Sequence, residues 1–195
     1  MNVQYTINNP KVISIFETTL RLIKDHGFHG TAMSKIAQEA DVAIGTIYHY
    51  FPSKDDLIIN LFQYCGDNLN NSLFKPLIEE LTYKDRFFYI WKAFVEFHQE
   101  NAEMFSFFEQ FYSSPYYQVN SCEINETISG QSKILKFLTE GINKGELRNT
   151  NVEALTCIFF GAAVSAIKGI KYRKLKSNES IDDIINIIWD GVKNK

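Results

Sequence analysis

Apolar residues recur every three to four positions along almost the whole chain, a spacing typical of amphipathic helices. The first helix is predicted to begin at Asn9-Pro10, to carry Ile13, Phe16 and Leu20 on one face and to end near Gly27. Further long helices are predicted at about 84–100, 102–112, 120–143, 152–173 and 180–193. No alternation of apolar and polar residues is long enough for a strand, so the pattern predicts an all-α fold.

Two short helices follow the first one. Thr31 is predicted to cap the earlier of them, Asp41 lies in the turn, and residues 44–50 form the later helix, which stops before Pro52. A tight turn between two short helices, braced by a longer helix, is the helix-turn-helix plan. In that plan the second short helix enters the major groove of DNA and reads base edges.

The segment "GTIYHYFPSK" (45–54) shows why the second short helix suits this role. Ile47 and Phe51 are four residues apart and can both point into the core. A glycine lets the backbone approach DNA closely, and tyrosine phenols can reach phosphates while their rings pack on protein. The outward positions are Gly45, Thr46, Tyr48, His49 and Tyr50.

A longer helix restarts after Pro52. Ser53 with Asp56 forms a capping box at its beginning, and Lys54 lies in its first turn. A phosphate bound there would satisfy both the lysine and the free N–H groups of the helix end.

The stretch "TAMSKIAQEADVAIGTIYHYFPSKDDL" (31–57) resembles the signature of the TetR family of bacterial transcriptional regulators. The matching positions are Thr31, Ile36, Ala37, Ala40, Val42, Gly45, Thr46, Tyr48, Tyr50, Phe51, Ser53, Lys54 and Leu57. Asp41 stands where the family usually has glycine, Ser34 where some relatives carry a basic DNA-contacting residue, and a basic N-terminal arm is missing. These differences bear on operator sequence and affinity.

The resemblance implies the domain plan: a helix-turn-helix DNA-binding domain at 1–56 and a helical ligand-binding and dimerisation domain at 57–195. It also implies a homodimer in which the last two long helices of each subunit form a four-helix bundle on a palindromic double-stranded operator. Together with the outward positions it predicts a set of DNA-binding residues: Thr31, Ser34, Ala43, Ile44, Gly45, Thr46, Tyr48, His49, Tyr50 and Lys54.

The local sequence agrees with a dimer seam near the C-terminus. Residues 161–169 are rich in small side chains, and the last helix, capped by Ser180 with Asp183, carries a continuous apolar stripe with Ile185 at its centre. The same stripe could instead form core within one chain.

Composition limits the alternatives. The net charge is −3, so any nucleic-acid site is a local patch. Three widely spaced cysteines favour a reducing compartment, and the apolar run at 157–167 is too short to cross a bilayer, so we expect a cytoplasmic protein without a membrane partner. Hydrolase, phosphate-loop and zinc-protease motifs are missing, so neither an enzyme, a cofactor nor a metal site is expected. His98, between Glu96 and Glu100, is expected to be solvated or hydrogen-bonded.

Aromatic residues are concentrated between Phe87 and Tyr112, where more than one helix face is apolar. Such a surplus either packs against neighbouring helices or lines a ligand cavity. For a cavity, the expected wall residues are Trp91, Phe94, Phe108 and Phe111, and the expected effector is small, hydrophobic, and neutral or cationic.

The functional hypothesis is a DNA-binding transcriptional regulator, a repressor released from its operator by that effector. Two alternatives stay open: an architectural or cell-division DNA-binding protein controlled by a protein partner without a small ligand, and an activator with the same DNA-binding head.

Overall fold

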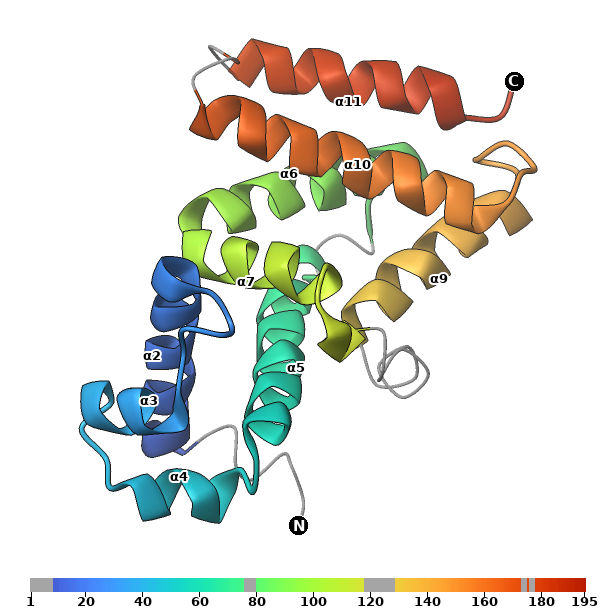
Figure 1. The fold of residues 1–195 in the computed structure, drawn as a ribbon. Coiled ribbons are helices and arrows are strands. Elements are labelled where there is room, and N and C mark those ends of the chain that lie inside the picture. The colour runs from blue at the N-terminus through green and yellow to red at the C-terminus, as the bar shows by residue number, and fades with distance from the viewer. Residues whose placement is uncertain (1–8, 76–79, 118–128, 173–174, 176–177) are drawn as a thin grey trace. The chain divides into compact units, whose positions relative to one another are not determined.

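The computed structural model describes residues 9–75, 80–117, 129–172, 175 and 178–195. Its helices are α2 (Pro10–His26), α3 (Met33–Glu39), α4 (Ile44–Tyr50), α5 (Lys54–Leu73), α6 (Tyr83–Glu100), α7 (Ala102–Tyr112), α9 (Ser129–Asn143), α10 (Val152–Lys171) and α11 (Asn178–Val192) (Figure 1). Across these ranges β-pairing is limited to an isolated bridge between Leu147 and Lys193, so the all-α prediction is confirmed. The first part of the helix predicted at 120–143 lies outside the described residues.

The helices belong to two compact units, which are described separately. One unit combines residues 1–66 with 101–127, and the other combines residues 67–100 with 128–195. The predicted DNA-binding region 1–56 lies within the first unit, which also contains α7. The expected domain boundary at 56/57 stays a prediction.

Local capping defines the helix ends of the first unit. The Asn9 side chain accepts a hydrogen bond from the Lys11 N–H at 2.9 Å, and Pro10 opens α2. Gly27 ends the helix with φ +69°, a conformation that favours glycine. Before α5, Ser53 Oγ accepts from the Asp56 N–H at 3.1 Å, while its hydroxyl donates to the Asp56 carboxylate at 2.6 Å. These predicted caps are therefore confirmed.

The core of the first unit joins α7 to the helix-turn-helix. Phe16 of α2 lies 5.4 Å from Phe51, ring centre to ring centre, and Phe62 of α5 stacks on Phe111 of α7 at 4.1 Å. The Gln110 side-chain amide of α7 donates to the Ile23 carbonyl oxygen near the end of α2 at 3.1 Å. Thus α7 braces the first helix of the DNA-binding region, although about 80 residues of chain separate them.

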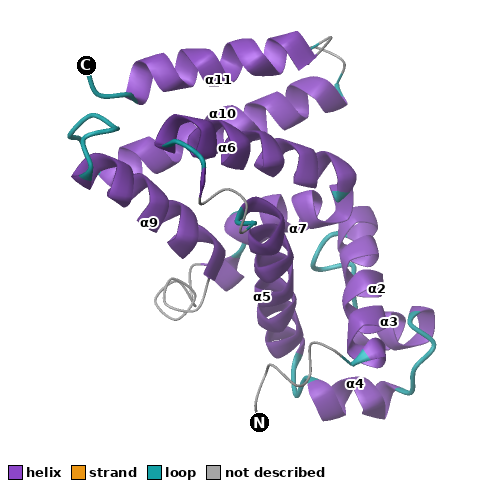
Figure 2. Ribbon diagram, turned by 180° about the vertical axis from the view of Figure 1, so that it is seen from behind, coloured by secondary structure: helices purple, strands orange, loops and turns teal. Residues whose placement is uncertain are grey.

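In the second unit α10 lies beside α11, and α6 packs against both (Figures 1 and 2). Its core is aromatic: the rings of Phe87 and Phe159 meet edge to face at 5.4 Å, and the Trp91 indole N–H donates to the Phe159 carbonyl oxygen at 3.1 Å. Tyr83 stacks on Phe137 at 4.6 Å and donates its hydroxyl to the Phe137 carbonyl oxygen at 3.0 Å. The buried indole N–H of Trp91 and the buried hydroxyl of Tyr83 therefore each have a hydrogen-bond partner.

Two expectations for α11 are wrong. The helix begins at Asn178, so Ser180 lies inside it and is not its N-cap. Ile185, expected at the centre of a dimer seam, has 0% of its surface exposed, and Ile188 and Trp189 are buried as well. The main apolar stripe of α11 therefore packs inside the unit. Ile187 of the same helix is 72% exposed to solvent.

Candidate nucleic-acid interface

The turn between α3 and α4 requires an unusual backbone at Asp41. Its φ is +52°, in the left-handed region, where aspartate is tolerated better than most residues. The following Val42 N–H donates to the Ala37 carbonyl oxygen at 3.0 Å and closes the turn on α3. This turn sets the direction in which α4 leaves α3.

Two side chains anchor α4 to the first unit. Ile47 and Phe51 are buried, as the spacing of four predicted, and Phe51 packs on Phe16. The opposite face is open: Ile44 is 41% exposed and Tyr48 is 50% exposed. Since α4 is short and held by only one face, its other face is free to enter a groove.

The backbone of α4 is also accessible at Gly45. A Cβ built on this glycine would meet no atom within 4 Å, so the space above the helix is empty. His49 and Ala43 are exposed and Thr46 is half-buried. Ser34, on α3, is exposed too. The structure therefore brings most of the predicted DNA-binding residues to one surface around α4.

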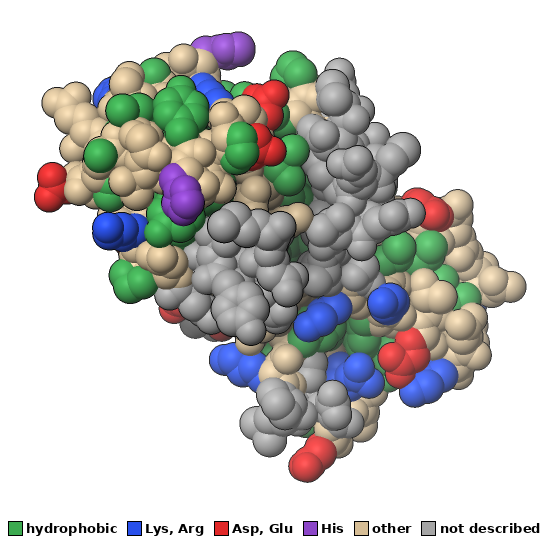
Figure 3. Space-filling model, turned by 90° about the horizontal axis from the view of Figure 1, so that it is seen from below, with side chains coloured by type: hydrophobic (Ala, Val, Ile, Leu, Met, Phe, Trp, Pro, Cys, Tyr) green, Lys and Arg blue, Asp and Glu red, His purple; other side chains and the backbone are tan. Residues whose placement is uncertain are grey.

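This surface is polar and apolar rather than strongly basic. The view from below, the side on which α4 lies in Figure 1, shows hydrophobic and histidine side chains next to one another, with Lys or Arg and Asp or Glu side chains scattered among them (Figure 3). Such groups offer hydrogen bonds and methyl contacts to base edges in the major groove.

Tyr50 is held by the beginning of α2. Its hydroxyl accepts a hydrogen bond from the Asn9 side-chain amide at 3.0 Å, and its ring meets that of His49 at 5.3 Å. The phenol is thus oriented by protein contacts, and its hydroxyl hydrogen remains available to a phosphate. This hydrogen bond could not be predicted from the sequence, because 41 residues separate Asn9 from Tyr50.

Thr31 and Lys54 both donate hydrogen bonds to carbonyl oxygens of the loop after α2. Thr31 is completely buried, and its hydroxyl donates to the Gly27 carbonyl oxygen at 2.8 Å, so it neither caps α3 nor offers its side chain to DNA. The Lys54 ammonium donates to the Phe28 carbonyl oxygen. This bond ties the loop before α3 to the start of α5 and leaves two of the three N–H groups for an anion.

The electrostatics of Lys54 follow from its partial burial. Removal from water lowers the pKa of its ammonium, and the neighbouring Asp55 carboxylate acts in the opposite direction. A phosphate or other anion beside Lys54 would stabilise the charged form further.

The four expected ligand-wall residues are all buried but belong to different units. Trp91 and Phe94 lie in the second unit, where Phe94 meets Phe160 edge to face at 5.2 Å. Phe108 and Phe111 lie in the first unit, where both rings pack on Phe62. Their role as ligand walls stays a prediction.

Of the two alternatives expected for His98, solvated or hydrogen-bonded, the solvated one is wrong. Its ring is buried between Phe94 and Phe97, at centroid distances of 4.5 and 5.3 Å, and burial lowers its pKa to about 4. It is therefore neutral at pH 7. In the part of the chain that the structure describes, no three His, Cys, Asp or Glu side chains lie close enough together to hold a metal ion.

Comparison with known proteins adds to this geometry. Residues 15–61 match the family model described as bacterial regulatory proteins, tetR family, and residues 62–194 match the tetracyclin repressor-like C-terminal domain. The fatty acid metabolism regulator protein of Bacillus subtilis is 30% identical, over 95% of this chain and 97% of its own length.

Two solved structures have the same fold. A TetR-family transcriptional regulator from Haemophilus influenzae gives a TM-score of 0.80 with 25% identity, covering 94% of this chain and 97% of its own. The transcriptional regulator FadR from Bacillus subtilis, solved in complex with stearoyl-CoA, gives a TM-score of 0.73 with 22% identity, covering 92% and 98%.

Proposed function

We propose that this chain, which belongs to the TetR family of bacterial regulatory proteins and is a DNA-binding transcriptional regulator, acts as a repressor. In this proposal a long-chain fatty acyl ligand releases it from its operator. The observation that carries the DNA-binding part is α4, which Ile47 and Phe51 hold by one face while the other face stays open. In this proposal His49 and Thr46 contact base edges, and Gly45 permits close approach.

The remaining contacts would position the DNA-binding region on the DNA duplex. Tyr48 and Tyr50 present phenols to backbone phosphates, and Lys54 uses its two remaining N–H groups in the same way. Ser34, Ala43 and Ile44 border this surface. Thr31 acts only indirectly, by holding the loop after α2.

We also propose a homodimer formed through α10 and α11. The most apolar window of α10 has a mean hydropathy of 1.5, yet only 28% of it is buried within the protomer. Ile158 on α10 is 47% exposed and Ile187 on α11 is 72% exposed. An apolar helix left open on one face is typical of a subunit interface.

Small residues on the same two helices favour close approach. A Cβ built on Gly161 of α10 or Gly191 of α11 would meet no atom within 4 Å, so a partner helix could pack directly on the backbone there. Two α10–α11 pairs would then form a four-helix bundle and present two α4 helices to half-sites about 34–36 Å apart on a palindromic operator.

By length and composition alone, α10 could also cross a membrane, but a single helix of this kind is weak evidence, because the core helix of a soluble protein meets the same criteria. We favour the interface, and with it a cytoplasmic location, because the relatives are transcription regulators. Those relatives also argue against an enzymatic role.

The acyl ligand is proposed from the relatives and from the apolar interior of the second unit. The Bacillus subtilis relative regulates fatty acid metabolism by its name. Trp91 and Phe94, with Phe159 and Phe160, surround an aromatic region that suits an acyl chain. Because these rings now pack on one another, entry of a ligand would require some of them to rotate. A coenzyme A thioester is anionic at one end, which revises the expected neutral or cationic effector.

The first experiment tests operator binding. The purified protein selects its operator from a randomised duplex library, and fluorescence anisotropy measures affinity for the selected sequence. We expect a palindromic consensus and a clear preference over a scrambled duplex. The absence of any enriched sequence would contradict the DNA-binding proposal.

The second experiment tests the ligand. Palmitoyl-CoA is titrated into the protein–operator complex, with coenzyme A and palmitate as separate controls. We expect release by palmitoyl-CoA at concentrations where coenzyme A alone has no effect. Unchanged operator affinity with palmitoyl-CoA would reject this ligand class and leave DNA recognition intact, and it would favour the partner-controlled alternative.

A further inference from the structure

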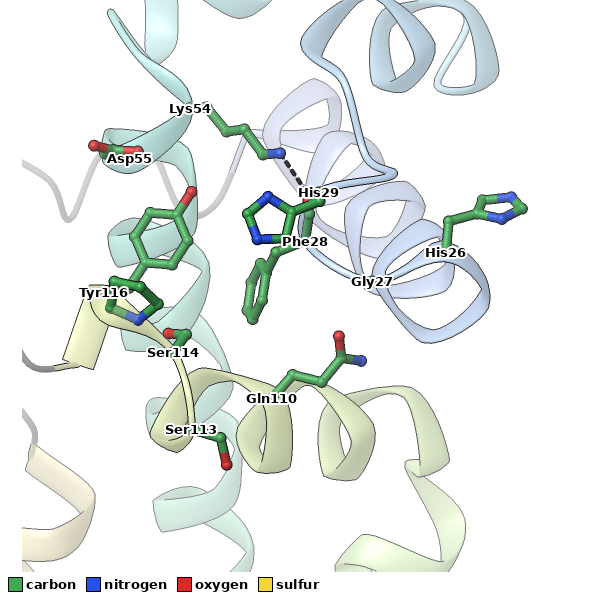
Figure 4. A pocket seen from close by; sticks show the side chains of 11 residues that line it. His26, Gly27, Phe28, His29, Lys54, Asp55, Gln110, Ser113, Ser114 and Tyr116 are labelled. Carbon is green, nitrogen blue, oxygen red and sulfur yellow. Dashed lines mark hydrogen bonds between the residues drawn. The ribbon is translucent and has the colours of Figure 1, made fainter.

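The first unit contains a cavity of about 620 Å³, and of its lining residues only Lys54 belongs to the proposed DNA contacts. Three segments form its walls: the end of α2 with the following loop, the first residues of α5, and the end of α7 with the turn after it (Figure 4). This volume lies within the range of small-molecule sites. All the lining residues belong to the same compact unit.

One side of the cavity is basic. The Lys54 ammonium, which donates a hydrogen bond to the Phe28 carbonyl oxygen, lies beside the His29 imidazole (Figure 4). Both side chains line the cavity. Lysine contributes two unused N–H donors and histidine at least one. Two adjacent donors of this kind are suited to the two oxygens of a carboxylate.

The neighbouring acidic group limits where an anion can lie. Burial raises the pKa of the Tyr116 phenol, and the nearby Asp55 carboxylate raises it further. Asp55 also lines the cavity and carries a negative charge. An anion is therefore favoured only on the side of Lys54 and His29.

The other side is aromatic. The Phe28 and Tyr116 rings lie 5.4 Å apart, and Phe28 is itself packed on Phe107. Gln110 also borders the cavity, and its side-chain amide donates to the Ile23 carbonyl oxygen. An aromatic wall beside two basic donors matches a ligand with a flat or aliphatic body and one anionic group.

We propose that this cavity binds a small organic anion of the carboxylate class, with its carboxylate on Lys54 and His29 and its apolar body against Phe28 and Tyr116. The site is separate from the acyl site proposed above and does not depend on it. Lys54 begins α5, three residues after Phe51, so ligand binding acts directly beside the end of α4. The anion and a DNA phosphate would share the Lys54 donors, so binding of either one weakens binding of the other.

The test measures binding to the intact protein by amide NMR at constant ionic strength. The probes are benzoate, cyclohexanecarboxylate, benzyl alcohol, benzylammonium and inorganic phosphate. We expect saturable shifts for the two carboxylates at the amides of residues 27–29, 54–55 and 113–116. Lys54→Met should weaken benzoate binding about tenfold, the usual effect of removing a charge-assisted hydrogen bond.

Matched variants separate the site from general charge effects. Lys24→Met removes an exposed lysine of the same unit that pairs with Glu103 outside the cavity, and it should leave the benzoate affinity unchanged. His29→Gln and Tyr116→Leu should each weaken binding, which keeps the test valid if Lys54→Met misfolds. The proposal is overturned if benzoate causes no saturable shift, if Lys54→Met and Lys24→Met bind alike, or if benzylammonium or phosphate binds as well as benzoate.

Discussion

The Asn9 side-chain amide donates to the Tyr50 hydroxyl at 3.0 Å, and this bond joins the first turn of α2 to the last turn of α4. The same asparagine caps α2 through its side-chain oxygen. One residue thus defines where the bracing helix begins and supports the end of the helix that is proposed to read DNA.

This dual role predicts unequal effects of two substitutions. Tyr50→Phe removes only the link between α2 and α4 and should lower the free energy of unfolding by about 0.5–1 kcal/mol. Asn9→Ala also removes the cap and should cost about 1–2 kcal/mol. Urea denaturation of both variants measures these values. Equal losses would show that the cap contributes nothing beyond the link.

The two faces of α4 should respond differently to truncation. Tyr48→Ala removes an exposed ring, so operator affinity should fall while the free energy of unfolding changes by less than about 0.5 kcal/mol. Ile47→Ala leaves a cavity in the core and should cost about 2–5 kcal/mol. Anisotropy titrations and urea melts on the same samples make the comparison. Normal operator binding by Tyr48→Ala would contradict the proposed role of this face.

The proposed dimer depends on Ile187 rather than on Ile185. Ile187→Glu should yield a folded monomer, because it places a charge in an apolar interface without touching the protomer core. Leu135→Glu, which alters a 39% exposed leucine on α9, is the matched control and should stay dimeric. Light scattering gives the mass of each variant, against 22.5 kDa for one chain. A dimeric Ile187→Glu protein would place the interface elsewhere.

His98 makes stability sensitive to acid. Its pKa is about 4 in the folded protein, below the ordinary value of 6.5, so the unfolded chain binds the proton more readily. The contribution of neutral His98 to the free energy of unfolding is about 3 kcal/mol in total. It is fully present above pH 6.5 and is lost as the pH falls toward 4. Between pH 7 and pH 4, the free energy of unfolding should therefore fall more steeply for the wild type than for His98→Leu. Parallel pH profiles would exclude this effect.

Glycine substitutions test packing in the second unit. An alanine Cβ at Gly141 would lie 2.1 Å from the Tyr83 hydroxyl oxygen, so Gly141→Ala should destabilise by about 1–3 kcal/mol despite the better helix propensity of alanine. Gly66→Ala, within α5, meets no atom within 4 Å and should be neutral or stabilising by up to about 1 kcal/mol. Thermal melts of the pair decide the sign. Similar changes for both would mean that Tyr83 moves away without cost.

The helices, most of their ends and the inward direction of Ile47 and Phe51 could be predicted from the amino-acid sequence. These features depend on neighbours within four residues: a capping side chain, a proline, or an apolar spacing that matches the helical turn. The Asn9-Pro10 start, the Ser53–Asp56 capping box and the left-handed Asp41 could all be predicted for that reason.

Which apolar helix faces are covered, and which polar side chains are already hydrogen-bonded, could be seen only in the folded structure. Periodicity shows that α11 has an apolar face, but only the packing of α6 and α10 shows that Ile185 is inside and Ile187 outside. Thr31 and Lys54 are both predicted to contact DNA from the sequence, and only the structure shows that each donates to a carbonyl oxygen of the loop after α2. Such partners come from distant or irregular backbone, whose position depends on the packing of the whole unit and not on local sequence.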